Sequence, residues 1–177
     1  MDVLIVVDVQ NDFVTGSLGT KEAQSIIPRI KKKIESYNRS DAIVIFTKDT
    51  HGDDYLETAE GKKLPVKHCV KGTEGWELVP ALKSEEELNF VICKHTFGYN
   101  NWKKFHHNFR YKPNIEMVGL CTDICVVSNA LILKALYPEC NITVDASCCA
   151  GSTPEKHKAA LEVMKSCQID IIGEEAE

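Results

Sequence analysis

The sequence predicts an α/β fold in three layers, an α/β/α sandwich with a mostly parallel sheet in the middle. Several short runs are rich in β-branched residues and apolar throughout, which is typical of strands buried on both faces. Other stretches repeat their apolar residues at helical spacing. The two kinds of run alternate along the 177 residues. That length suits one domain, residues 1–177.

The apolar runs predict six strands. We expect them at Asp2–Val9, Asp41–Thr47, Leu88–Lys94, Ile115–Leu120, Asn141–Asp145 and Gln168–Ile172. We expect helices at Lys21–Tyr37, Trp76–Ser84, Asp123–Leu136 and Thr153–Ser166. The last of these has Pro154 at its first position, where proline is favoured. Residues 48–75 read as a long functional loop, and residues 97–111 as irregular chain with a short helix near Asn101.

Composition excludes several classes of function. The hydrophobic content of 44% and charged content of 27% are ordinary for a globular protein. The net charge is −5, and the only basic run, Lys31–Lys33, reads as a solvated helix face, so nucleic acid is not an expected partner. No stretch approaches the ~20 apolar residues of a membrane span. The first residues lead directly into a strand without signal-peptide features, which predicts a cytoplasmic protein.

The eight cysteines are many for a chain of this length. In a reducing compartment they are expected to be free thiols, several of them buried as small apolar residues. No two cysteines have the CxxC spacing, which argues against a structural zinc ribbon and against a thioredoxin-like site.

Reactive side chains follow four of the predicted strands. They are Asp8, Asp49, His51, Lys94, Cys121 and Cys125. Ligands of open parallel sheets bind in the crevice at the carboxyl ends of the strands, so these side chains are expected to meet at one edge.

Cys125 lies near the start of the predicted helix that follows the fourth strand. Free N–H groups and the helix dipole there favour a thiolate and can bind an oxyanion. The alternative is a buried structural cysteine. Cys121 is expected to be a small residue packed at the strand end. The alternative is that Cys121 forms a redox pair with Cys125.

Asp8 and Lys94 each interrupt or end an apolar strand. A buried carboxylate should have a raised pKa unless it is paired, which suits a proton shuttle. Lys94 would hold Asp8 ionised and steady developing charge. The alternatives are a helix cap or structural ion pair for Asp8 and a surface lysine for Lys94.

The long loop holds candidate metal ligands. Two carboxylates and two imidazoles, Asp49, His51, Glu60 and His68, suit a divalent ion such as Zn, Fe or Mn. Asp49 and His51 lie two residues apart, which places both on one side of an extended chain. Rival ligands are Asp53, Asp54 and Glu57, and the alternative is that these are scattered loop residues.

Five motifs agree in order with one known family. DVQNDF, TKDTH, LPVKHCVKGTEGWEL, VICKHTFGYNN and GLCTDICV together resemble the isochorismatase-like cysteine hydrolases, and among them the nicotinamidases, also called pyrazinamidases. The resemblance covers nearly the whole chain and implies a Rossmann-like sheet of six parallel strands with helices on both sides.

The resemblance implies a role for each catalytic residue. The family's Asp–Lys–Cys triad matches Asp8, Lys94 and Cys125, with Cys125 as the nucleophile. A cis peptide bond is implied between Leu120 and Cys121, and the backbone N–H groups of Cys121 and Cys125 form the implied oxyanion hole. The substrate-binding residues implied are Phe13, Leu120 and Cys121.

The resemblance also implies a metal site. Asp49, His51 and His68 match its ligand pattern, while the usual third histidine is missing between His51 and His68. Glu60 fits that place best and Glu57 is the second choice. Zinc is the expected ion, with iron or manganese as alternatives. The aromatic residue often found before the last histidine is also missing from residues 64–67, which predicts a wider or differently shaped pocket.

The implied activity is metal-assisted hydrolysis of nicotinamide to nicotinate and ammonia through a thioester on a cysteine. One alternative is a metal-free relative that acts on a carbamoyl or ureido compound, and another is a non-catalytic α/β module that binds a small ligand. The implied partners are a small amide and further copies of the chain in a homo-oligomer. The pocket wall could include His95, Tyr99, Trp102, His106 and His107, or these residues could simply pack.

Overall fold

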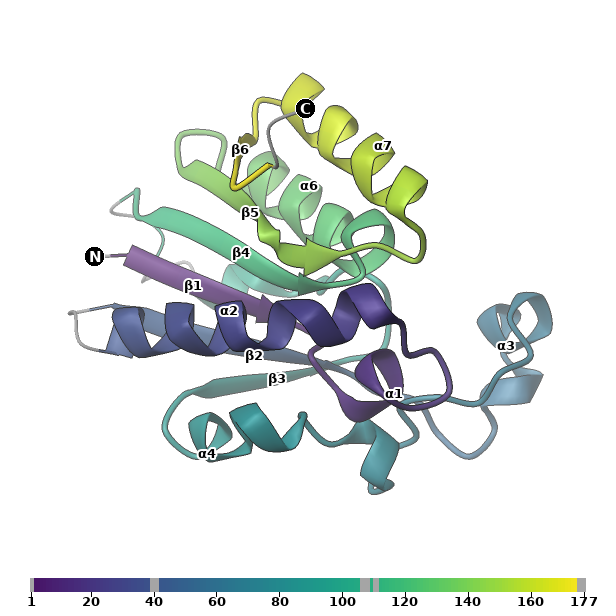
Figure 1. Ribbon diagram of the computed structural model, residues 1–177. Helices are drawn as coiled ribbons and strands as arrows, with labels where there is room; N and C mark the ends of the chain where they lie inside the picture. The colour runs from purple at the N-terminus through teal and green to yellow at the C-terminus, as the bar shows by residue number, and fades with distance from the viewer. Residues whose placement is uncertain (1, 39–41, 106–108, 110–111, 175–177) are drawn as a thin grey trace.

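A sheet of six parallel strands forms the centre of the computed structural model, which describes residues 2–38, 42–105, 109 and 112–174 (Figure 1). The strands are β1 (Asp2–Val7), β2 (Ile43–Asp49), β3 (Phe90–Lys94), β4 (Asn114–Leu120), β5 (Asn141–Ala150) and β6 (Asp170–Ile172). Their order across the sheet is β3-β2-β1-β4-β5-β6. The predicted six-stranded α/β fold is confirmed.

Helices cover both faces of the sheet. They are α1 (Asn11–Val14), α2 (Lys21–Asn38), α3 (Ala59–Lys63), α4 (Lys83–Glu86), α6 (Val127–Leu136) and α7 (Pro154–Ser166). In Figure 1, α2 crosses in front of the sheet and α6 lies behind it. The two faces bury separate cores, because alternate strand residues point to opposite sides. Leu4 packs with Ile30 on the α2 side, and Ile5 packs with Leu133 on the α6 side.

The strand order reverses between β1 and β4, and this is where an open parallel sheet forms its binding crevice. The two strands approach closely at their carboxyl ends, where Val7 pairs with Gly119. Gly119 has a φ of 120°, and a Cβ at this position would collide with the Val7 backbone. Glycine is therefore required for β1 and β4 to meet at the crevice.

Several predicted boundaries differ at this same edge. The first strand ends at Val7, two residues early, because Asp8 takes a left-handed conformation with a φ of 50°. The helix predicted at Asp123–Leu136 begins instead as one wide helical turn, Thr122–Val126. The regular helix α6 starts only after this turn. The fifth strand continues beyond the predicted Asp145, to Ala150. Local chain geometry at the crevice thus overrides the simple periodic pattern.

Segments that lie outside the sheet differ more from the sequence reading. The predicted helix Trp76–Ser84 is replaced by two short 3₁₀ turns, Glu74–Trp76 and Pro80–Leu82, followed by α4. Residues 48–75 are not a plain loop, because β2 extends to Asp49 and the rest forms an arm that carries α3 (Figure 1). The short helix expected near Asn101 is present as a 3₁₀ turn.

Two expectations about the surface and the thiols can be compared with the structure. Lys31 and Lys32 are exposed as expected, but Lys33 is not part of a solvated face, because it pairs with Glu116 and Asp145 across the sheet. All eight cysteines lie in the described part of the chain, and each is a free thiol, as expected. Among the described helices, none combines the length and apolarity needed to span a bilayer.

Candidate active site

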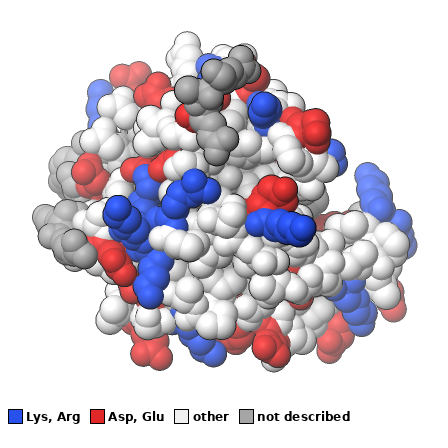
Figure 2. All heavy atoms as spheres, viewed as in Figure 1, with Lys and Arg blue, Asp and Glu red and all other residues white. Residues whose placement is uncertain are grey.

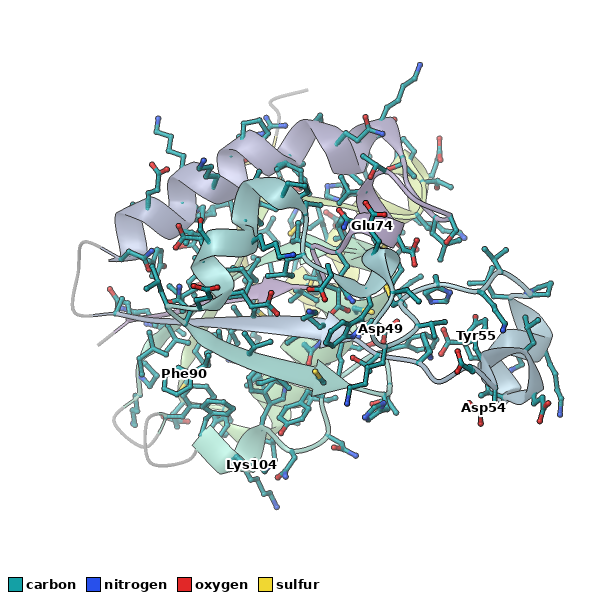
Figure 3. The ribbon with its side chains drawn as sticks, turned by 90° about the horizontal axis from the view of Figure 1, so that it is seen from below. Asp49, Asp54, Tyr55, Glu74, Phe90 and Lys104 are labelled. Carbon is teal, nitrogen blue, oxygen red and sulfur yellow. The ribbon has the colours of Figure 1, made fainter. Side chains whose placement is uncertain are left out.

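Four polar side chains meet where the strands end, and we call them the strand-end cluster: Asp8, Asp49, Lys94 and Cys125. Asp8 follows β1, while Asp49 and Lys94 end β2 and β3, which are paired in register at these two residues. Cys125 lies on the wide turn after β4. In Figure 3, Asp49 lies at one end of the sheet and Phe90, which begins β3, at the other. The parallel strands bring these residues together, as the sequence predicted.

Lys94 is the centre of the strand-end cluster. Its Nζ lies 2.6 Å from Asp8 Oδ2 and 3.2 Å from Asp49 Oδ1, and it donates to Cys125 Sγ at 3.4 Å. Lys94 is 1% exposed and Asp8 is fully buried. One ammonium group therefore holds two carboxylates and the thiol in fixed positions away from bulk water.

Burial and neighbouring charge set the protonation of this cluster. Burial raises the pKa of Asp8, and the Lys94 ammonium offsets only part of that effect. Burial would lower the pKa of Lys94, but the charges of Asp8 and the other anionic groups outweigh it and raise that pKa. Lys94 therefore stays a cation, while Asp8 is able to bind and release a proton.

The expectation of a ready thiolate at Cys125 is wrong for the isolated site. Burial raises the pKa of Cys125 well above its usual value, and the negative charge of Asp8 raises it further. Cys125 lies within the wide turn Thr122–Val126, which leads directly into α6. The resting thiol is protonated, so it needs a base when it reacts.

A second group of side chains adjoins Asp49, and we call it the donor cluster: Asp49, His51, Glu60 and His68. One ligand atom each from Asp49, His51 and His68 lies within 4.8 Å of the others. Glu60 Oε1 lies 3.8 Å from His51 Nε2 and 3.7 Å from His68 Nε2. Asp53, Asp54 and Glu57 make no ion pair with either imidazole in the described part of the chain.

Backbone pairing brings the two halves of the donor cluster together. His51 N donates to the Cys69 carbonyl at 3.0 Å, and Lys71 N donates to the His51 carbonyl at 2.9 Å. His68 therefore lies beside His51 although 17 positions separate them in the sequence. Glu60 comes from α3, so the arm closes the cluster from outside.

The donor cluster fits a divalent metal ion. Its two carboxylates and two imidazoles are the ligand types that zinc takes. His68 Nδ1 is 2.8 Å from the Val66 carbonyl oxygen, which orients Nε2 towards the other donors, as in metal-binding histidines generally. Asp49 keeps its charge, because hydrogen bonding to His51 and the Lys94 charge lower its pKa despite burial.

Both clusters open into one cavity of about 670 Å³. Its walls include Asp49, Glu60 and His68 of the donor cluster and Cys125 of the strand-end cluster. All three residues expected to bind substrate, Phe13, Leu120 and Cys121, also line it. The Leu120–Cys121 peptide bond is cis, as the family resemblance implied.

The other residues considered for the pocket wall divide into one that lines the cavity, two that pack in or against the core, and two that lie outside the described residues. His95 lines the cavity, and its Nδ1 lies 2.8 Å from the Thr50 carbonyl oxygen. Trp102 is fully buried in the core, and the Tyr99 ring packs against it with 5.3 Å between ring centroids. His106 and His107 lie outside the described residues.

Three supporting residues were missed in the sequence. Thr47 Oγ1 donates to Asp8 Oδ1 at 2.6 Å. Gln10 is fully buried and clamps the end of β2, donating to the Asp49 carbonyl at 2.8 Å and accepting from the Asp49 N–H at 2.7 Å. Tyr55 packs its ring edge-on against both imidazoles, 4.6 Å from His51 and 4.9 Å from His68 between centroids.

A signal existed for two of these three. Gln10 lies two positions after Asp8, and Thr47 lies two positions before Asp49, so the period of a strand places each on the same side as a site carboxylate. Tyr55 lies on the arm, labelled in Figure 3, where no sequence period applies.

Comparison with known proteins gives the same family for fold and site. Residues 2–176 match the family model described as the isochorismatase domain. A nicotinamidase of Schizosaccharomyces pombe is 28% identical, over 97% of this chain and 92% of that protein. A protein of Arabidopsis thaliana described as a probable inactive nicotinamidase is 30% identical, over 92% of this chain and 87% of its own length.

A solved structure agrees with these sequence relatives. The pyrazinamidase of Pyrococcus horikoshii in complex with zinc superposes with a TM-score of 0.81 at 28% identity, covering 97% of this chain and 98% of the other. Its relatives include nicotinamidases and pyrazinamidases, and since the family model spans almost the whole sequence, the chain belongs to the isochorismatase family.

Proposed function

We propose that this protein hydrolyses nicotinamide to nicotinate and ammonia, with Cys125 as nucleophile and a divalent ion, zinc first, in the donor cluster. One observation carries the proposal. Asp8, Lys94 and Cys125 make a buried contact network at the wall of a cavity that also exposes metal-ligand groups. Activated nucleophile, base and charge stabiliser are the parts that an amide hydrolase needs.

The first half of the reaction uses Asp8 twice. Asp8 accepts the Cys125 proton as sulfur bonds to the amide carbon, and the carbonyl electron pair moves onto oxygen. The oxyanion is stabilised by the backbone N–H groups of Cys121 and Cys125. When this intermediate collapses, the C–N bond breaks and Asp8 returns the proton to nitrogen, so ammonia leaves and a thioester remains.

The second half repeats the same proton transfers with water. Asp8 accepts a proton as water attacks the thioester, the C–S bond breaks, and the sulfur of Cys125 takes the proton back. Nicotinate is released. Lys94 stays protonated throughout and holds Asp8 in place, because its own pKa is raised. Thr47 keeps the Asp8 carboxylate in one orientation through its hydrogen bond.

The donor cluster and the apolar wall position the ring. A bound ion would act as a Lewis acid for the ring nitrogen of the substrate, which holds the amide towards Cys125. Asp49, His51, Glu60 and His68 would be the residues that hold the ion. Phe13 lies on the same side, with its ring centroid 5.5 Å from that of His68, so it can pack on a bound pyridine ring.

The test is ammonia release from nicotinamide by the purified protein, before and after chelation and after return of zinc, iron or manganese. We expect release that falls on chelation and recovers with metal. Cys125→Ala should abolish it, while Cys140→Ala, a buried cysteine that does not line the cavity, should keep it. Mass spectrometry of acid-quenched enzyme should find the nicotinoyl group on Cys125.

Absence of release with every metal would overturn the proposal if Cys125 still reacts with an electrophile. In that case carbamoyl and ureido compounds are the next substrates to assay, without added metal. Unreactive Cys125 together with no release would instead favour a non-catalytic binding module.

A further inference from the structure

The cavity is larger than the proposed substrate requires. Its volume of about 670 Å³ lies within the ~300–1,000 Å³ range of sites that enclose drug-sized ligands. Nicotinamide is one small ring with one amide group. Cys125 and the donor residues Asp49, Glu60 and His68 make up only part of the lining, and the proposed reaction has no use for the rest of it.

The mouth of the cavity presents exposed apolar side chains. Leu64, just after α3, is 39% exposed, and Phe97, after β3, is 46% exposed, and both line the cavity. Leu18 adds a further apolar side chain to the lining. Large exposed apolar side chains gathered around a cavity mouth indicate contact with an apolar part of a ligand.

Two lysines line the same cavity from different helices. Lys63 ends α3, and Lys156 lies in the first turn of α7. Neither forms an ion pair within the described part of the chain. Figure 2 shows basic side chains gathered over α3 at the right-hand edge of the molecule. Both lysines therefore border the cavity, and neither has an ion-pair partner among the described residues.

The carboxylates that line the cavity are already engaged. The carboxylates that line the cavity among the described residues are Asp49 and Glu60, and both face the imidazoles of the donor cluster. Asp123, on the turn beside Ser152, accepts hydrogen bonds from Ser152 N and Ser152 Oγ, each at 2.7 Å. The free positive charge at the cavity mouth is thus available to a ligand.

We propose that the preferred substrate is a primary amide larger than nicotinamide, with an apolar extension that ends in an anionic group bound by Lys63 and Lys156. This inference rests on the proposed hydrolysis and names the substrate class for the same site. The amide lies against Cys125, the extension packs between Leu64 and Phe97, and the anion reaches the two ammonium groups.

The test compares substrates that differ in charge alone. One probe is nicotinamide with a propanoate chain on C5, the ring carbon that adjoins neither the ring nitrogen nor the amide-bearing carbon, and the other is the methyl ester of the same compound. We expect the acid to have a kcat/KM about ten-fold above that of the ester at low salt, since two exposed charge pairs contribute modestly. The advantage should shrink as salt screens the charges.

Variants locate the effect. Lys63→Gln and Lys156→Gln should each lower the acid-to-ester ratio about three-fold, and the double variant should bring it close to one. Lys62→Gln and Lys158→Gln are matched controls on the same two helices, and neither residue lines the cavity. The controls should leave the ratio unchanged. An acid that is no better than its ester, or a ratio that the controls change equally, would overturn the inference.

A binding measurement separates this inference from the proposed reaction. Calorimetry with the Cys125→Ala protein measures the affinity for both probes without turnover. If no amide is hydrolysed but the acid binds more tightly than the ester in a Lys63- and Lys156-dependent way, the anion site stands and the reaction is wrong. If nicotinamide is hydrolysed but acid and ester bind equally, the reaction stands and the anion site is wrong.

Discussion

The strand-end cluster has a counterpart elsewhere on the sheet, a helix-facing cluster made of Lys33, Tyr37, Glu116 and Asp145. Lys33 pairs with Glu116 and lies 2.6 Å from Asp145 Oδ2. Tyr37 Oη donates to Glu116 at 2.6 Å. Both clusters pair a lysine with two carboxylates, but only the strand-end cluster adjoins the cavity and includes a thiol.

Their pKa shifts differ because Asp8 is buried more completely than Asp145. In the helix-facing cluster, hydrogen bonds from Lys33 and Ser147 outweigh burial and lower the pKa of Asp145. In the strand-end cluster burial wins at Asp8, whose pKa is raised. A carboxylate whose hydrogen bonds outweigh its burial stabilises the fold as an anion, whereas one for which burial prevails is ready to exchange a proton. Similar residues thus serve stability in one place and chemistry in the other.

The largest effect should come from removing the cation of the strand-end cluster. Lys94→Met leaves Asp8 and Asp49 buried without their partner, so we expect a loss of about 3–5 kcal/mol in the free energy of unfolding. Turnover should fall on the order of 10³-fold. Urea denaturation and ammonia release measure the two effects.

The double variant Asp8→Asn with Lys94→Met sharpens this result. It removes both charges, so stability should return to within about 1–2 kcal/mol of the parent while activity stays lost. Recovery of both properties would show that the strand-end cluster is only structural, like its counterpart.

The next largest effect should be stabilisation of the protein by a metal ion bound in the donor cluster. The helix-facing cluster is not expected to bind one. Zinc at about 100 times its Kd should add about 2.7 kcal/mol to the free energy of unfolding. His51→Ala should lose this response, and His95→Ala, which removes a cavity imidazole outside the donor cluster, should keep it. Thermal unfolding with and without zinc measures the response. An unchanged response in His51→Ala would place the ion elsewhere.

Lys33→Met in the helix-facing cluster should cause a smaller loss in the free energy of unfolding. Its side chain is 18% exposed, so water reduces the penalty on the two carboxylates to about 2 kcal/mol. Lys32→Met on the exposed side of α2 is the control and should change stability by less than about 0.5 kcal/mol. Activity per folded molecule should be retained in both. A drop in activity for Lys33→Met would mean that the two clusters are coupled.

The smallest effect is the acid dependence of the helix-facing cluster. The pKa of Asp145 is lowered from its ordinary value of 3.8, so the unfolded chain binds a proton more readily than the folded protein. The stability that ionised Asp145 contributes is therefore fully present above its ordinary pKa of 3.8. This stability is lost as the pH falls through the lower pKa that Asp145 has in the folded protein. Denaturation between about pH 6 and about pH 2 should show a shallower acid loss for Asp145→Asn than for the parent. If stability fell equally steeply with pH in Asp145→Asn and in the parent, Asp145 would not contribute to the acid dependence.

The sequence predicts the strand-end residues for a definite physical reason. Asp8 and Lys94 end apolar strands, and the carboxyl ends of parallel strands share one edge, so the encounter follows from the strand pattern alone. Lys33 shows the opposite case. In the sequence it belongs to a basic helical run, and its partners Glu116 and Asp145 come from distant strands with no periodic signal that links them.

The protonation of Cys125 also lay beyond the sequence. A cysteine near a helix start predicts a thiolate, but full burial and the charge of Asp8 act in the opposite direction. Burial is a property of the packed molecule, so its electrostatic cost follows only from the three-dimensional neighbours.

By itself the sequence determined the alternating elements, the parallel sheet, the crevice edge and the family, because these depend on local periodicity and on motif order. Tertiary structure alone decided between Glu60 and Glu57 as the carboxylate beside both imidazoles, that Tyr55 packs against those imidazoles, and that Lys63 and Lys156 share a cavity. These contacts join segments far apart in the chain, and their distances follow from how the arm and helices pack against the sheet.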